Sequence, residues 1–174
     1  MAPSSYQAPT ATAARRPSTF SQSVSSNTTT ETATVSKLMD HKGKGAFTIR
    51  PTDTISDAVK ILKEKRIGAL IVTDDDGVMK GILSERDIVR KLAETPGQTL
   101  PQKVEDNMTR DVVTCKLADP LVLVLRQMNE GRFRHMPVME GDLLVGILTI
   151  GDVVGYRLNE LEHEALQLKQ MIVG

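Results

Sequence analysis

Two stretches of the sequence match each other: Gly81-Ile82-Leu83-Ser84-Glu85-Arg86-Asp87 and Gly146-Ile147-Leu148-Thr149-Ile150-Gly151-Asp152. The offset between them is 65 residues, and it is 66 residues between Arg66 and Arg132, so one deletion in a turn separates the two copies. Solenoid repeats have periods of about 20–50 residues. The longer period therefore indicates a small folding unit that is used twice.

Each copy predicts the same order of elements: strand, helix, strand, strand, helix. A β-prone run precedes a helix whose apolar residues recur at i, i+3, i+4 and i+7, and two more apolar strands follow. The expected elements cover residues 47–49, 55–62, 69–72, 78–83 and 85 onward, then 112–115, 121–128, 136–138, 143–148 and 150 onward. Thr54 is expected to cap one helix, and Asp119 with Pro120 to open its counterpart. The fold class is α+β, with tandem β-α-β-β-α motifs that pack together because one copy alone makes a marginal core.

The repeated hydroxyl residue and the acid three positions after it allow two interpretations. In the first, Ser84 with Asp87 and Thr149 with Asp152 form capping boxes, with Asp in place of the usual Glu or Gln. In the second, the helix N-terminus and the hydroxyl hold a phosphate, while the carboxylate accepts both hydroxyls of a ribose. The residue pattern alone leaves both interpretations open.

The pair of repeats resembles a tandem CBS-domain module, the Bateman module named after cystathionine β-synthase. The resemblance covers about residues 34–158. It rests on the two matching stretches, on Asn107-Met108-Thr109 and on Arg134-His135-Met136-Pro137-Val138. It implies two CBS motifs with pseudo-twofold symmetry and two clefts. Such clefts commonly hold AMP, ADP, ATP, NAD(H) or S-adenosylmethionine.

By position, the resemblance implies which residues bind the polar parts of such a ligand. Asp87 and Asp152 would hold ribose, and Ser84 and Thr149 would hold phosphate. The groups that would neutralise phosphate are Arg132, Arg134 and His135, with Arg86 and Arg66 in the first motif. Simple packing on its strand is the alternative for His135.

The resemblance also implies the surroundings of the adenine. The backbone that flanks the adenine would come from Thr48, Ile49, Thr114 and Cys115. The apolar walls would come from Ile67, Ala69, Met136 and Pro137. Gly68 and Ala69 stand in the first motif where Arg134 and His135 stand in the second. The two clefts are therefore not expected to be equivalent.

Residues 1–34 differ in composition from the rest, because 24 of them are Ser, Thr, Ala or Pro. Such a segment buries too little apolar surface to offset its ordering entropy, which predicts a disordered tail. Arg15 and Arg16 in this acid-poor leader also fit a transit peptide, which would direct the protein to the mitochondrial matrix instead of the expected cytoplasm. The other predicted regions are a first motif at 35–94, a linker at 95–102, a second motif at 103–158 and a C-terminal helix at 159–174.

Composition excludes several kinds of partner and site. The 22 Lys and Arg balance 22 Asp and Glu, and aromatic residues make up 3%, so no nucleic-acid partner is expected. No apolar run approaches the roughly 18 residues of a membrane span. The single cysteine, Cys115, predicts a buried inert thiol, and no metal site is expected. The segment 41–45 is glycine-rich but lacks the Gly-Lys-Ser/Thr ending of a P-loop, and predicts a flexible turn.

The C-terminal segment predicts one helix with a heptad-like seam. The seam residues are Val154, Leu158, Leu161, Ala165, Leu168 and Ile172. This face either covers its own domain or builds a homodimer, and we favour the homodimer because CBS modules often pair.

These features lead to the hypothesis of a non-catalytic regulatory module that senses an adenosine nucleotide and acts on a separate, unidentified protein. No catalytic residue is assigned. The alternative is a ligand-free structural or dimerisation module in which the repeated Ser/Thr-x-x-Asp strings are only caps. An enzyme, the third class, would need an acid–base pair with matched pKa values.

Overall fold

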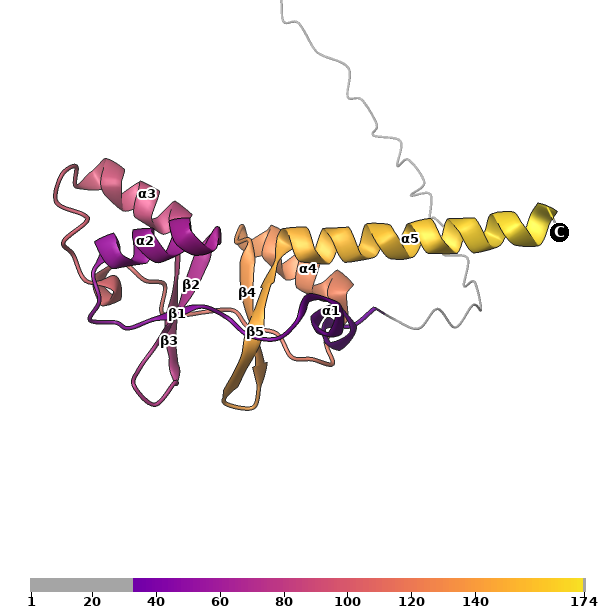
Figure 1. Cartoon of the computed structure of the whole chain (residues 1–174), viewed down its shortest axis with the longest axis horizontal. Coiled ribbons are helices and arrows are strands. Elements are labelled where there is room, and N and C mark those ends of the chain that lie inside the picture. Colours follow the sequence, from indigo (N-terminus) through magenta and orange to yellow (C-terminus); the bar gives the residue numbers. More distant parts are fainter. Residues whose placement is uncertain (1–32, 174) are drawn as a thin grey trace, which may run out of the picture. The chain divides into compact units, whose positions relative to one another are not determined.

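The computed structural model describes residues 33–173, so the predicted tail lies almost wholly outside the described residues. The first repeat contains β1 (Thr48–Ile49), α2 (Ile55–Lys65), β2 (Ala69–Thr73), β3 (Met79–Ser84) and α3 (Glu85–Glu94) (Figure 1). Its three strands form one sheet in the order β1-β2-β3, with β1 parallel and β3 antiparallel to β2.

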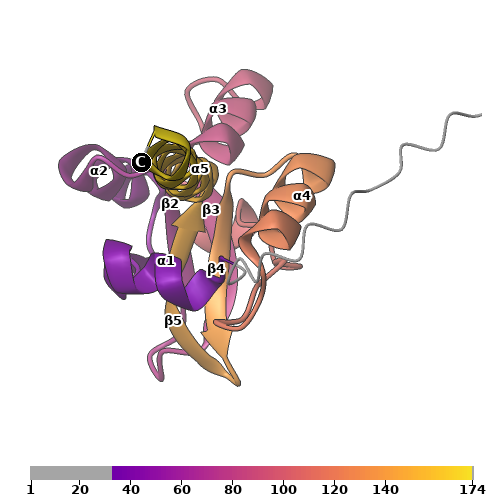
Figure 2. The same ribbon diagram turned by 90° about the vertical axis from the view of Figure 1, so that its right-hand side faces the viewer.

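The second repeat contains α4 (Leu121–Gly131), β4 (His135–Glu140), β5 (Leu143–Thr149) and the long α5 (Ile150–Val173), with β4 and β5 antiparallel. An apolar layer joins the two sheets, because Ala69, Ile71 and Ile82 pack with Leu144 and Ile147. Figure 2 views the strands of the two sheets one behind the other. The predicted α+β class, with a repeated unit and a C-terminal helix, is confirmed.

The predicted strand at residues 112–115 forms only an isolated bridge between Cys115 and Val138. The reason lies in β4. In the first repeat the N–H of Ile71 donates to the carbonyl of Phe47 at 3.0 Å and holds β1 in place. The residue equivalent to Ile71 is Pro137, which has no N–H to donate, so the second ladder cannot extend toward Val113.

The two helix starts predicted at residues 54 and 119 differ from each other. Thr54 caps α2 in a capping box with Asp57, as expected. At α4 the N-cap is Pro120 and no side chain caps it, so the prediction for Asp119 is wrong. The Asp119 carboxylate instead accepts the N–H of Lys116 at 2.8 Å, which closes the turn before the helix.

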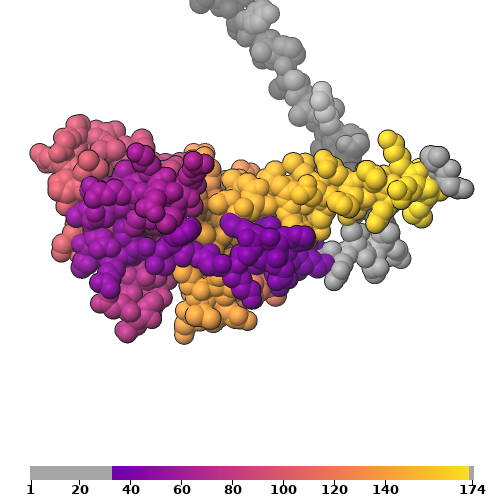
Figure 3. Space-filling model, in the orientation of Figure 1, coloured from indigo at the N-terminus to yellow at the C-terminus, as the bar shows by residue number. Residues whose placement is uncertain are grey.

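The segment before each repeat packs on the other repeat. The unpredicted helix α1 (Val35–Lys42) buries Val35, Leu38 and Met39 in the core of the second repeat, among Leu121, Val124 and Met128. Figure 3 shows this indigo segment against the orange and yellow parts of the chain. Conversely, the short 3₁₀ helix η1 (Val104–Asp106) places Val104 in the core of the first repeat. The glycine-rich segment at 41–45 is thus partly helical, because its first two residues end α1.

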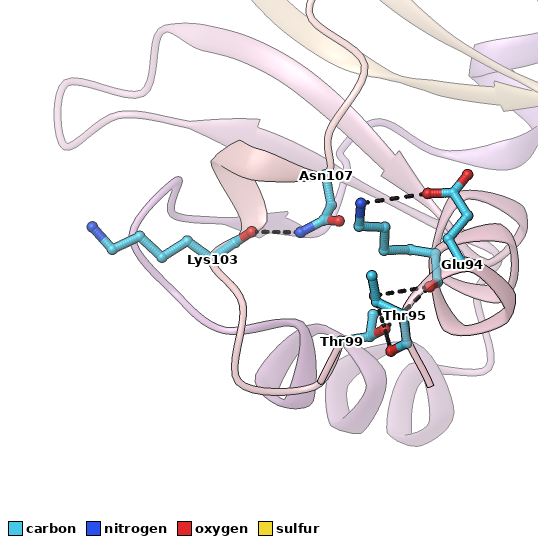
Figure 4. A network of polar contacts seen from close by, with 6 residues as sticks. Glu94, Thr95, Thr99, Lys103 and Asn107 are labelled. Carbon is cyan, nitrogen blue, oxygen red and sulfur yellow. Dashed lines mark hydrogen bonds and ion pairs between the residues drawn. The ribbon is translucent and has the colours of Figure 1, made fainter. Parts of the chain in front are cut away.

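The linker between the repeats is tied to α3 and α2. Thr99 is fully buried, and its hydroxyl donates to the carbonyls of Lys91 and Thr95 at the end of α3 (Figure 4). The carbonyls of Leu100 and Gln102 accept the first N–H groups of α2, at 2.9 Å each. The linker therefore completes the N-terminus of α2 as well as connecting the repeats.

The seam of α5 is exposed from its first residue onward. Its large apolar members are all exposed: Val154, Leu158, Leu161, Leu168 and Ile172. The residue that α5 buries in the second core is Val153, which lies outside the seam. The seam therefore does not cover its own domain. No helix among residues 33–173 has the length and apolar character that crossing a membrane requires.

Candidate functional site

The predicted motif of the first repeat is a complete capping box at the start of α3. The Oδ2 atom of Asp87 accepts the N–H and the hydroxyl of Ser84, at 3.0 and 2.6 Å, while Ser84 Oγ accepts the N–H of Asp87. Both protein bonds to the carboxylate use the same oxygen. Oδ1 has no hydrogen-bond donor among the described residues, so capping and ligand binding do not exclude each other.

A cavity of about 580 Å³ lies beside this capping box, between the two repeats. Its walls come from both copies: the ends of β3 and the start of α3 on one side, and the turn from α4 into β4 on the other. Six predicted ligand residues line it: Ser84, Arg86, Asp87, Arg132, Arg134 and His135.

The other predicted ligand residues lie elsewhere. Met136, a predicted wall residue, is fully buried in the second core, so its side chain does not form a wall of the cavity. Ile49 and Cys115, predicted to contribute backbone, also lie in the cores and do not line this cavity. Ala69 packs in the apolar layer between the sheets, and Pro137 pairs with Ile147. The rest are Thr48 in β1, Ile67 against the first core, Thr114 before the bridge at residue 115, and Thr149 and Asp152 at the start of α5.

Sequence reasoning missed several residues that line the cavity. They are Gly68, Ile82, Arg90, Thr109, Asp111, Val112, Val113, Gly131 and Phe133. Arg90 follows Arg86 by four residues, and a helix places such residues on one face, so this spacing was a usable signal. For residues 109–113 the sequence signal was weaker. It was Gly81 in the repeated motif, whose missing side chain lets this segment approach β3. A Cβ at Gly81 would lie 2.6 Å from the carbonyl oxygen of Thr109.

The cavity is rich in positive charge. Arg86, Arg90, Arg132 and Arg134 line it together with two carboxylates, Asp87 and Asp111. Arg86 donates to the carbonyl of Arg132 at 2.9 Å and so joins α3 of the first repeat to the end of α4. No carboxylate of residues 33–173 forms an ion pair with any of the four arginines. Such unpaired guanidinium groups suit a ligand with phosphate or carboxylate groups.

His135 lies half-buried at the edge of the cavity. Burial and the neighbouring Arg134 lower the pKa of its imidazole, against a smaller opposing effect of Glu85. The imidazole is therefore neutral at pH 7, with one nitrogen able to donate and the other able to accept.

The second motif has the same capping geometry but an additional partner. The N–H of Thr149 donates to Asp152 Oδ2 at 2.7 Å, and Thr149 Oγ1 accepts the N–H of Asp152. The ammonium group of Lys42 also bonds to Asp152 Oδ2. Partial burial by itself would raise the pKa of Asp152, but the hydrogen bonds from Lys42 and Thr149 outweigh it and hold the pKa below its usual value.

Neither a reactive thiol nor a metal-ligating cluster is found among residues 33–173. Burial raises the pKa of the Cys115 thiol to about 12, so the group stays protonated and unreactive at neutral pH. Within residues 33–173, no cluster of three or more His, Cys, Asp or Glu side chains could hold a metal ion.

The family model for the CBS domain matches residues 35–94 and 103–159. The chain belongs to the CBS-domain family. The CBS-domain-containing protein CBSX3 of Arabidopsis thaliana, named as mitochondrial, is 32% identical over 152 residues, which make up 83% of this chain and 74% of the relative. The chain spans 24% of the longer plant protein CBSCBSPB2.

Solved structures of CBS-domain proteins have the same fold. The protein ATU1752 of Agrobacterium tumefaciens is 42% identical, with a TM-score of 0.71 over 72% of this chain and 99% of that chain. CBSX2 in complex with AMP is 27% identical, with a TM-score of 0.62 over 73% and 97%. The CBS pair of MJ0100, in complex with 5′-methylthioadenosine and S-adenosyl-L-methionine, is 26% identical, with a TM-score of 0.65 over 74% and 98%.

Proposed function

We propose that the cavity beside α3 binds an adenosine nucleotide and that the chain is a regulatory module for a separate protein. One observation carries this proposal: Asp87 and four arginines from both repeats meet in a single cavity. The free oxygen of Asp87 would accept the ribose hydroxyls, and the arginines would bind phosphate. Because the cavity draws on both repeats, a ligand there would favour one arrangement of the two.

The charge of the cavity supports a ligand with phosphate groups. Four guanidinium groups face two carboxylates, and the neutral His135 adds no charge, so the lining has a net charge of +2. AMP, ATP and NAD(H) are anions, whereas the sulfonium of S-adenosylmethionine adds a positive charge. We therefore propose AMP, ATP or NAD(H) rather than S-adenosylmethionine.

The related structures support the adenosine part of the proposal. CBSX2 binds AMP, and the CBS pair of MJ0100 binds 5′-methylthioadenosine and S-adenosyl-L-methionine. These ligands share an adenosine group and differ in what is attached to it. In this chain the arginines of the cavity would bind the group attached to the adenosine.

The test compares two carboxylates with the same capping geometry. Asp57 in α2 accepts the Thr54 hydroxyl at 2.6 Å, the same distance as between Ser84 Oγ and Asp87 Oδ2, but Asp57 does not line the cavity. Calorimetric titration with AMP, ATP, NADH and S-adenosylmethionine gives each Kd. Asp87→Asn should weaken nucleotide binding about tenfold or more, as expected for the loss of a charged hydrogen-bond partner. Asp57→Asn should leave binding unchanged.

The same experiment tests the alternative of a ligand-free structural module. If the strings are only caps, both substitutions lower thermal stability and wild-type protein binds none of the four compounds. In the proposed case, a nucleotide at about 100 times its Kd stabilises the wild type by about 2.7 kcal/mol. We propose no catalytic step, so the bound nucleotide should be recovered chemically unchanged; its turnover would contradict the proposal.

We further propose that the chain forms a homodimer through α5. Leu158, Leu161, Leu168 and Ile172 recur at heptad-like spacing, and all are exposed on a single continuous helix. A second copy presents the same apolar seam, so the two helices would bury each other's exposed side chains.

Of the two predicted locations, we propose the mitochondrial matrix rather than the cytoplasm. CBSX3 is named as a mitochondrial protein, which supports the transit-peptide interpretation of residues 1–34 over a cytoplasmic location. A fusion of residues 1–34 to a fluorescent protein should reach mitochondria. A diffuse cytoplasmic signal would favour the other branch.

A further inference from the structure

The carboxylate of the second motif already has a cation of this chain as its partner. The Nζ atom of Lys42 donates to Asp152 and, at 2.9 Å, to the carbonyl of Ile147 on β5. The equivalent carboxylate, Asp87, has no such partner: among residues 33–173, no Lys, Arg or His forms an ion pair with it. The two motifs therefore share a capping box and differ in whether the carboxylate is paired.

The pair between Lys42 and Asp152 is partly shielded from water. Their side chains are 30% and 25% exposed, whereas the surface pair between Arg50 and Asp75 is 67% and 80% exposed. A shielded pair is screened less by water and salt, so its ammonium is harder to displace. Lys42 also ends α1, whose apolar residues are buried in the second core, so the helix holds the ammonium in place.

Three of the four arginines of the first cavity have no equivalents around Asp152. At an offset of 65 residues, Arg86 corresponds to Gly151 and Arg90 to Gly155; at an offset of 66, Arg134 corresponds to Gly68. Only Arg132 keeps its charge, in Arg66. A phosphate group near Asp152 would thus lose three of the four guanidinium partners that the first cavity offers.

We infer that the chain binds a single nucleotide, beside Asp87, and that Lys42 replaces a ligand at Asp152. The second motif then serves as a structural counterpart in which an internal ion pair ties α1 to β5 and α5. This inference rests on the proposed function for the first cavity and assigns a different task to the second.

The experiment measures stoichiometry and affinity by calorimetric titration with ATP and with AMP on the full chain. Wild-type protein should bind one nucleotide per chain. Asp152→Asn should keep both the stoichiometry and a Kd within about twofold of wild type, while Asp87→Asn raises the Kd about tenfold or more. Two nucleotides per chain, or an equal loss of affinity in both variants, would overturn the inference.

A second measurement, made without nucleotide, tests the ion pair directly. Lys42→Met and Asp152→Asn should each lower the melting temperature by about 3 °C, and the double variant should lower it by no more than the larger single effect. Additive losses would show that the two residues are not coupled and would contradict the role of Lys42. If wild-type protein binds no nucleotide, the proposed function fails and the single-site assignment with it, while this coupling still decides the role of Lys42.

Discussion

The imidazole of His135 lies against the backbone of Gly68, so that a Cβ at residue 68 would be only 2.9 Å from Nε2 of His135. Gly68 is the residue of the first repeat that corresponds to Arg134. The two repeats thus meet where the backbone of Gly68 contacts the imidazole of His135.

This contact makes Gly68→Ala destabilising. The added methyl group would displace the tip of the half-buried ring, and holding a side chain away from its preferred rotamer costs about 0.5–1.5 kcal/mol of unfolding free energy. Chemical denaturation measures the loss. Gly155→Ala in α5 is the matched control, because no atom lies within 4 Å of its Cβ position, and we expect it to be neutral or to stabilise by up to about 1 kcal/mol. Equal effects of the two substitutions would contradict the contact.

The lowered pKa of His135 predicts a pH dependence of stability. Below an unfolded-state pKa of about 6.5, the unfolded chain takes up a proton that the buried imidazole resists, so the unfolding free energy falls as the pH falls. The slope from this one group can reach about 1.4 kcal/mol per pH unit. His135→Gln should flatten the curve of unfolding free energy, measured by chemical denaturation, below about pH 6.5.

Substitutions of two arginines with left-handed backbone conformation should distinguish an effect on stability from an effect on ligand binding. Arg66 and Arg132 end α2 and α4 with φ values of 53° and 55°. Glycine avoids the steric cost of this conformation, so Arg66→Gly and Arg132→Gly should each raise the unfolding free energy by about 1 kcal/mol. Only Arg132 lines the cavity, so only Arg132→Gly should also weaken nucleotide binding. Equal affinity in the two variants would argue against a ligand role for Arg132.

The proposed homodimer predicts a position-dependent effect of charge on α5. Leu168 belongs to the heptad-like seam and is 60% exposed, while Leu166 is 61% exposed but lies outside it. Leu168→Glu should convert the dimer to a monomer in light scattering coupled to gel filtration, because a buried unpaired carboxylate disfavours association. Leu166→Glu should leave the dimer intact. A wild-type monomer at micromolar concentration would exclude the homodimer.

Local patterns in the sequence predicted most of the fold because the repeat supplied each pattern twice. Both helices after the Ser/Thr-x-x-Asp strings begin where expected, since the hydroxyl residue and the acid lie within one turn. The absent strand at residues 112–115 depends on Pro137, and helix α1 on apolar partners in the second repeat. Such long-range dependences are not visible in a window of ten residues.

The cavity was predictable only in part for the same reason. Ser84 and Asp87 belong to one motif, and the charge of Arg132 and Arg134 was evident. The partner of Asp152 was not, because Lys42 lies 110 residues away and in a segment that looked like a flexible turn. Residues such as Met136 were assigned to the ligand by position, and the alternation of side chains along β4 directs that one into the core instead.

The exchange of leading segments between the repeats has a consequence for cooperativity. Val35, Leu38 and Met39 complete the core of the second repeat, and Val104 completes that of the first. The core of each repeat thus contains side chains from the segment that precedes the other repeat. The two repeats should therefore unfold in one thermal transition rather than two. A truncation that removes α1 would therefore destabilise the C-terminal half of the chain most, because it exposes the core of the second repeat to water.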